Sequence, residues 1–152
     1  SPFFVLDYFW RMNSIRKSII AIGAFSMATA VILGALGAHA LEGQLTPDQL
    51  DSFKTGVRYQ AWHSLALVFL GFTGNQILSL KSFKTLGFLF TGGIIFFSVS
   101  IYLLNTRDLL GIDSWKSFLG PVTPIGGLLF FSGLFFLGIK AIQRKKVPKR
   151  TK

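Results

Sequence analysis

The chain has 152 residues, of which 51% are hydrophobic and 15% aromatic, with a mean hydropathy of +0.54. The absence of cysteine excludes disulfides, thiolate metal sites and thiol catalysis. The formal charge of +10 would favour a nucleic-acid partner if it covered a soluble surface, but its distribution along the chain indicates a membrane protein instead.

Four stretches contain no Asp, Glu, Lys or Arg, and they are Ile19–Leu41, Tyr59–Leu80, Phe88–Thr106 and Leu119–Ile139. A bilayer core about 30 Å thick is crossed by about 20 apolar residues of helix. The sequence therefore predicts an all-α fold, an integral membrane bundle of four transmembrane helices over residues 18–142. A water-soluble bundle is the alternative, but its helices should carry a regular polar stripe. Four helices and their connecting loops would use most of the 152 residues, so no separate soluble catalytic domain is expected.

The amino-terminal residues 1–17 are expected to lie outside the bundle. Ser1–Trp10 is rich in aromatic residues and precedes Met12, so it is either an upstream extension of the reading frame or an interfacial segment in the head groups. A cleaved signal peptide ending near Ala38-His39-Ala40 is a further alternative. The uncharged run before that site, however, exceeds the 7–15 residues typical of a signal core.

Small residues in the first stretch lie four apart, at Ala30, Gly34 and Ala38. Such stripes allow helix backbones to approach closely in lipid. We expect the first helix to pack through this face and to be central to the bundle. Gly126 and Gly127 predict a second close approach near the start of the fourth helix, where two prolines suggest a bent beginning.

The loop after the first stretch predicts a short amphipathic helix on the outer membrane surface. Thr46 is a candidate N-cap, Pro47 the first helical residue, and Gln49 completes a capping box. The apolar residues of this helix fall on one face, and they are Leu50, Phe53 and Val57.

Twelve of the sixteen basic residues lie on one predicted side of the membrane, namely Arg11, Arg16, Lys17, Lys81, Lys84, Lys140, Arg144, Lys145, Lys146, Lys149, Arg150 and Lys152. Because Lys and Arg stay preferentially on the cytoplasmic side, both termini are expected in the cytoplasm. The basic tail, residues 143–152, is then an orientation signal that also attracts anionic lipids. No nucleic-acid partner is expected.

The candidate functional residues centre on the chain's two histidines, His39 and His63. Tyr59, Gln60 and His63 share one helical face. If the first two helices are antiparallel neighbours, both imidazoles lie at a similar depth near the outer boundary. Thr123 and Pro124, which begin the fourth helix, complete this predicted polar cluster.

Three interpretations of the cluster remain open. The imidazoles hydrogen-bond across helices as structural groups, or they sit at the interface without a role, or they bind a metal, haem or quinone. A metal bound by His39 and His63 would need Glu42, Asp48 or a partner subunit for its third ligand. We expect no metal or other cofactor.

The four stretches argue against carboxylate-coupled transport, because none has a central charged residue of the kind that forms proton relays. No enzyme is expected either. Ser64 adjoins His63, but neighbouring helical residues point about 100° apart, so no nucleophile–base pair is predicted.

Four motifs together resemble one family: GALGAHAL at 34–41, TGVRYQAWHSLAL at 55–67, FFSVSIYLL at 96–104 and GPVTPIGGLLFFSG at 120–133. In the same order they are similar to the signatures of the domain of unknown function 423 family, which is similar to transmembrane protein 256. The resemblance covers about Met12–Ile142. It implies a small, bacterial-type, multi-pass protein of the inner (plasma) membrane, with four helices and no established activity.

Within the resemblance, the family signatures fall on named residues of this chain. Those residues are Gly37, Ala38, His39, Tyr59, Gln60, His63, Thr123, Pro124, Gly126 and Gly127. Leu36 stands where an aromatic residue is common in the family, which we interpret as a packing change.

Three functional hypotheses follow. The first is a non-enzymatic accessory or packing subunit that meets lipid, a second copy or a larger membrane complex through its apolar helix faces. The second is a small transporter of a neutral or apolar solute, with a midplane cavity lined by Ser98, Ser100, Thr91 or Tyr102. The third is a metal-, haem- or quinone-binding protein that uses His39 and His63.

Overall fold

The structure is a computed structural model that describes residues 13–143, apart from the side chains of residues 75–77. Every regular element in that range is helical, which confirms the predicted all-α class. The elements in chain order are α2 (Ser14–Ala38), α3 (Pro47–Ile77), α4 (Leu80–Gly93), the π-helical η1 (Ile94–Val99), α5 (Ser100–Leu110), the 3₁₀ turn η2 (Asp113–Trp115) and α6 (Lys116–Ile142). The predictions for residues 1–12 and 144–152 lie outside the described range.

Within residues 13–143, three helical segments are long and apolar enough to cross a membrane. They are α2, the run Leu80–Leu110 formed by α4, η1 and α5, and the run Asp113–Ile142 formed by η2 and α6. The helix α3 has 31 residues and is long enough, but it is less apolar and is not one of these three segments. Its apolar half carries Gln60 and His63, and its first turns carry several charges, so its hydropathy is low.

The predicted start of α3 is confirmed, but the separate surface helix is wrong. The Thr46 hydroxyl accepts from the Gln49 amide at 3.3 Å, and the Gln49 side chain accepts from the Thr46 amide at 2.9 Å. The helix then continues without a break to Ile77. Its apolar face packs on protein, because Phe53 is only 2% exposed and its ring centroid lies 4.9 Å from that of Tyr102.

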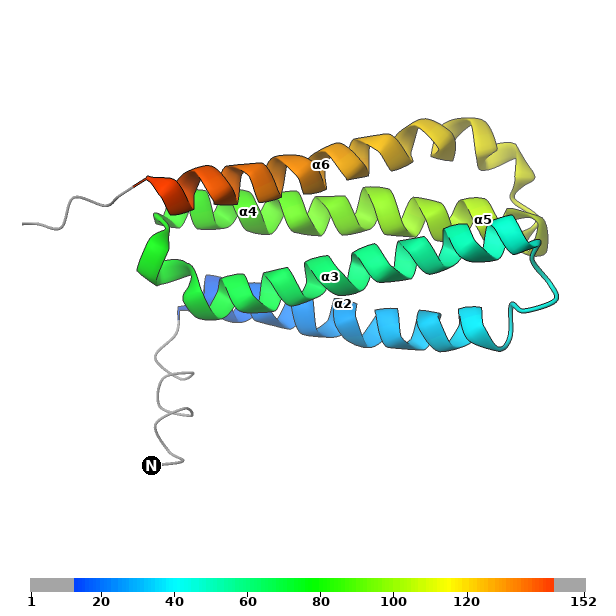
Figure 1. The fold of residues 1–152 in the computed structure, drawn as a ribbon, viewed down its shortest axis with the longest axis horizontal. Coiled ribbons are helices and arrows are strands. Elements are labelled where there is room, and N and C mark those ends of the chain that lie inside the picture. The colour runs from blue at the N-terminus through cyan, green and yellow to red at the C-terminus, as the bar shows by residue number, and fades with distance from the viewer. Residues whose placement is uncertain (1–12, 144–152) are drawn as a thin grey trace, which may run out of the picture.

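The helices follow one another across the molecule in the order α2, α3, α4–α5 and α6 (Figure 1). The helix α3 contacts α2 on one side and α4, η1 and α5 on the other, while α6 covers α4, η1 and α5. The expectation that the first helix is central is therefore wrong, since α2 has extensive contacts with α3 alone. Only 17% of its most apolar window is buried, against 50% for Leu80–Leu110.

The predicted small-residue stripe of α2 is partly buried. Ala30 is 2% exposed, and a Cβ on Gly34 would lie 3.5 Å from Val57 of α3. Ala38, in contrast, is exposed at the end of the helix. The helices α2 and α3 also approach closely at Gly23, which the stripe did not include, where a Cβ would lie 2.7 Å from the Ser64 carbonyl oxygen.

The closest approach of α6 to its neighbours is at Gly126. A Cβ there would collide with the backbone of Phe96 and Phe97 in η1, so this position requires glycine. Gly127 is half-buried and would contact only the Phe97 ring, at 3.7 Å. The two prolines were predicted to bend the beginning of the fourth helix. They lie inside α6 instead, because this helix begins at Lys116 and continues through Pro121 and Pro124.

The beginning of α2, the turn between α3 and α4, and the end of α6 lie at one end of the molecule (Figure 1). We call this the basic end, because the described Lys and Arg residues there are not accompanied by any described Asp or Glu. Arg16 is buried at this end and donates from Nε to the Gly71 carbonyl at 2.8 Å and from its guanidinium to the Phe72 carbonyl.

Candidate functional site

A polar network centred on Gln60 joins three helices in the protein interior. Gln60 is 5% exposed, and its Nε2 donates to the Ser26 carbonyl and to the Thr29 hydroxyl of α2, both at 2.8 Å. Its Oε1 accepts from the Tyr102 hydroxyl of α5 at 2.7 Å. The fully buried Ser64 donates to the Ser26 hydroxyl at 2.7 Å. The amide of Gln60 is thus satisfied at both ends, as buried polar groups usually are.

His63 belongs to an aromatic cluster where α3 faces α4 and α6. The ring is 5% exposed and stacks on Phe130 of α6, with centroids 3.5 Å apart and planes at 14°. Its Nδ1 lies 2.8 Å from the Tyr59 carbonyl oxygen, and because a carbonyl only accepts, Nδ1 carries a proton. Tyr59 packs on Phe97 with centroids 4.7 Å apart. These contacts connect α3 to η1 and α6.

His39 is far from this cluster. It is exposed and forms the C-cap of α2, where its amide donates to the Ala35 carbonyl at 3.1 Å. Gly37 faces Phe53, so His39 lies level with the residues near position 51 of α3. That level is about twelve residues from His63, or about 18 Å along the helix axis.

The predicted two-histidine neighbourhood is therefore wrong. The prediction began the second helix at Tyr59, but α3 begins at Pro47, so Tyr59 and His63 lie deep in the helix. Among residues 13–143, no group of three or more His, Asp or Glu side chains is placed to hold a metal ion.

Thr123 forms a third, smaller polar contact between α5 and α6. Its Oγ1 lies 2.7 Å from Ser100 Oγ, which also donates to the Phe96 carbonyl at 2.6 Å. Pro124 is exposed. The residues predicted as one cluster thus divide into the Gln60 network, the His63 stack and the Thr123–Ser100 pair, with His39 and Pro124 outside all three.

Sequence reasoning missed the partners of Gln60. Ser26 and Thr29 are among the few polar residues of an apolar helix and are three apart, so their face could have been assigned to the interior. It also missed Asn105, whose Nδ2 donates to Ser52 Oγ at 2.9 Å and connects α5 to α3. Ser98 of η1 is fully buried, and its hydroxyl has no partner within the described part of the chain.

The arrangement offers little for catalysis. Ser64 donates to Ser26, and His63 bonds the Tyr59 carbonyl, so these two neighbours do not form a nucleophile–base pair. Both groups are also buried.

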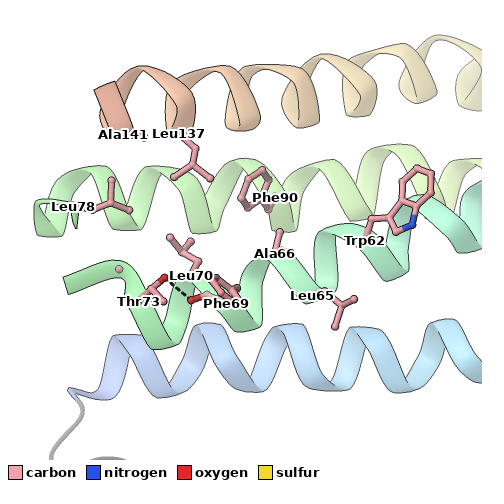
Figure 2. A pocket seen from close by; sticks show the side chains of 11 residues that line it. Trp62, Leu65, Ala66, Phe69, Leu70, Thr73, Leu78, Phe90, Leu137 and Ala141 are labelled. Atoms are coloured by element: carbon pink, nitrogen blue, oxygen red, sulfur yellow. Dashed lines mark hydrogen bonds between the residues drawn. The ribbon is translucent and has the colours of Figure 1, made fainter. Parts of the chain in front are cut away.

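Grooves are hollowed in the surface of the described part of the chain, and two of them, a larger and a smaller one, do not reach the Gln60 network. The larger, of about 660 Å³, lies between α3, α4 and α6, as Figure 2 shows. Its lining is apolar, and the residues are Trp62, Leu65, Ala66, Phe69, Leu70, Thr73, Gly74, Leu78, Phe90, Leu137 and Ala141. We call it the α3–α6 groove.

The smaller groove, of about 330 Å³, lies between α2 and α3 at the other end of the molecule. It includes the charged residues Asp51, Lys54 and Arg58. Neither groove is lined by any of the four residues expected around a transport cavity.

The profile of one protein family, described as a protein of unknown function (DUF423), matches residues 33–127. The chain belongs to the DUF423 family. This match includes the first three sequence motifs and the beginning of the fourth, and it confirms the resemblance of these motifs to that family.

Relatives extend the similarity over most of the chain. It is 35% identical over 127 residues to the UPF0382 membrane protein YwdK of Bacillus subtilis, covering 84% of this chain and 98% of the relative. UPF0382 membrane proteins of Staphylococcus haemolyticus and Staphylococcus aureus are 35% and 36% identical over 128 residues, each covering 84% of this chain and 97% of the relative. No solved structure matches significantly. This DUF423 chain is thus a helical membrane protein from a family without an assigned activity.

Proposed function

We propose that this DUF423 protein crosses the inner (plasma) membrane four times, with both termini in the cytoplasm, and acts as a non-enzymatic accessory subunit. In this role it packs against a second copy of itself or against a larger membrane complex. It needs no cofactor and no nucleic-acid partner for this function.

The fourth crossing is supported by the surroundings of α3. This helix lies between α2 and the run Leu80–Leu110, both of which are apolar enough to span a bilayer. Gln60, His63 and Ser64 lower its hydropathy, yet all three are buried against neighbouring helices rather than exposed to lipid. Polar residues at membrane depth characteristically face the bundle interior and find partners there.

The accessory role rests on one observation, the unpartnered outer face of α2. Within the described chain, α2 packs extensively on α3 alone. Its outer face exposes Phe25 at 75%, together with Val31 and Ile32. Ala24 and Ala28 are also exposed there, and small residues allow a second helix to approach closely. A helix of this kind is suited to pairing within the membrane.

The two other hypotheses lack such an observation. The hydroxyl of Tyr102, one of the residues expected to line a transport cavity, instead donates to Gln60. The two histidines expected to share a ligand lie at levels about 18 Å apart in the direction of the α3 axis.

Disulfide crosslinking in membranes tests the role directly, because the natural sequence has no cysteine. The variant Ala28→Cys should form a crosslinked dimer on mild oxidation or, if a larger complex is the partner, should appear in a stable assembly on native mass spectrometry. The control Leu128→Cys changes an exposed residue of α6 and should remain uncrosslinked. A monomer alone, with no crosslink at either position, would contradict the accessory role.

A further inference from the structure

The α3–α6 groove has the chemistry of a lipid-binding site (Figure 2). Its volume of about 660 Å³ lies within the range of about 300–1,000 Å³ typical of small-molecule sites. Its lining is almost wholly apolar. The hydroxyl of Thr73 already donates to the Phe69 carbonyl at 2.8 Å, so it offers no free donor to a polar ligand.

The length of the groove matches one leaflet of the bilayer. Along α3 its lining extends from Trp62 to Gly74. The helix rises about 18 Å between these two residues, a little more than half of the hydrocarbon thickness of about 30 Å. The groove ends beside Leu78 and Ala141, at the basic end of the molecule. It therefore spans the depth that an acyl chain of that leaflet would occupy.

The charge at this end suits an anionic head group. Lys140 directly precedes Ala141, and its Nζ lies 5.3 Å from the Phe136 ring centroid and donates to Gln143 Oε1 at 2.9 Å. Lys81 and Lys84 are exposed at the same end. All the Asp and Glu residues of the described range lie at the other end, and they are Glu42, Asp48, Asp51, Asp108 and Asp113.

We infer that the α3–α6 groove binds one acyl chain of an anionic phospholipid, whose phosphate is held at the basic end by Lys140. The apolar lining supplies non-directional affinity for the chain, and the cationic end selects the head group. This inference depends on α3 crossing the bilayer, but not on the accessory role or on the proposed orientation.

Native mass spectrometry tests the inference on the full-length protein. The protein is reconstituted in vesicles with equal amounts of phosphatidylglycerol and phosphatidylcholine that carry identical palmitoyl and oleoyl chains. It is then extracted in mild detergent, and the retained lipid is identified. We expect one phosphatidylglycerol per chain, retained at least about fivefold over phosphatidylcholine, since one basic residue near the surface contributes about 1 kcal/mol.

Two pairs of variants locate the site. Ala141→Phe fills the mouth of the groove and should lower retention of both lipids, whereas Ala21→Phe changes an exposed alanine of α2 and should leave retention unchanged. Lys140→Gln should lower the preference for phosphatidylglycerol about fivefold, and Lys116→Gln, at the other end of α6, should not.

Three results would overturn the inference: no retained lipid, equal retention of the two lipids, or equal loss in the Ala21→Phe and Ala141→Phe variants. If Ala141→Phe does not fold, the Lys140→Gln and Lys116→Gln pair still decides the head-group contact. Crosslinking of the Ala28→Cys variant in the same vesicles reports separately on the accessory role.

Discussion

Gln60 of α3 accepts a hydrogen bond of 2.7 Å from the hydroxyl of Tyr102 of α5, while its amide nitrogen donates to α2. One side chain thus connects three helices in the interior. This explains how a helix of low hydropathy fits a membrane protein, since its polar groups are paired with protein and not exposed to lipid.

We expect Gln60→Leu to destabilise the protein by about 1–3 kcal/mol, because the Tyr102 hydroxyl loses its acceptor and stays buried. Tyr102→Phe removes that unpaired hydroxyl, so the double variant should lose less stability than the two single variants added together. Unfolding in detergent, followed by circular dichroism, measures the three changes. Strict additivity would show that the two groups are not coupled.

Gly126→Ala should be among the most damaging small substitutions. The added methyl group collides with the backbone of η1, and overpacking of this kind costs about 1–3 kcal/mol or more. A Cβ on Gly138 of the same helix would meet no described atom of another helix within 4 Å, so Gly138→Ala is the matched control. Equal melting temperatures for the two variants would contradict the close packing of α6 on η1.

The two histidines should differ sharply on substitution. His63→Ala removes the ring stacked on Phe130 and leaves a cavity, with an expected cost of at least about 2 kcal/mol. His63→Phe keeps an aromatic ring and should stay within about 1.5 kcal/mol of the natural protein. His39→Ala changes an exposed residue and should have an effect below about 0.5 kcal/mol.

A metal, haem or quinone site would give a different pattern. Both His39→Ala and His63→Phe would then lose a bound ligand visible by absorption or elemental analysis. Stability measured beside metal content separates a structural role for His63 from a ligand role.

Much of the fold could be predicted from the sequence because lipid-facing helices leave a strong signal. The apolar stretches located α2 and α6 to within about five residues, whereas the run Leu80–Leu110 begins eight residues before the predicted Phe88. The capping box located the start of α3. The sequence did not predict that α3 continues without a break from Pro47 to Ile77, because the charged residues around Gly56 are typical of a loop. In the structure this region is helical, and Phe53 packs on Tyr102.

The candidate site was harder to predict, because its residues depend on helix register. The polar residues of α3 were identified, but their partners Ser26, Thr29 and Tyr102 lie on other helices, and no spacing along the chain pairs them. The π-helical segment η1 has no composition of its own, since it differs from an α-helix only in hydrogen bonding. The sequence feature related to η1 is Gly126, because the lack of a side chain there allows α6 to contact the η1 backbone.

The proposed four crossings make a direct prediction about which ends are accessible. Single cysteines are introduced at Gln44, between α2 and α3, and at Gln143, after α6, both of which are exposed. The measurement is labelling by a membrane-impermeant maleimide in intact and permeabilised cells. We predict that Gln44→Cys reacts in intact cells and that Gln143→Cys reacts only after permeabilisation. Labelling of Gln143→Cys in intact cells, or protection of Gln44→Cys there, would contradict the proposed arrangement in the membrane.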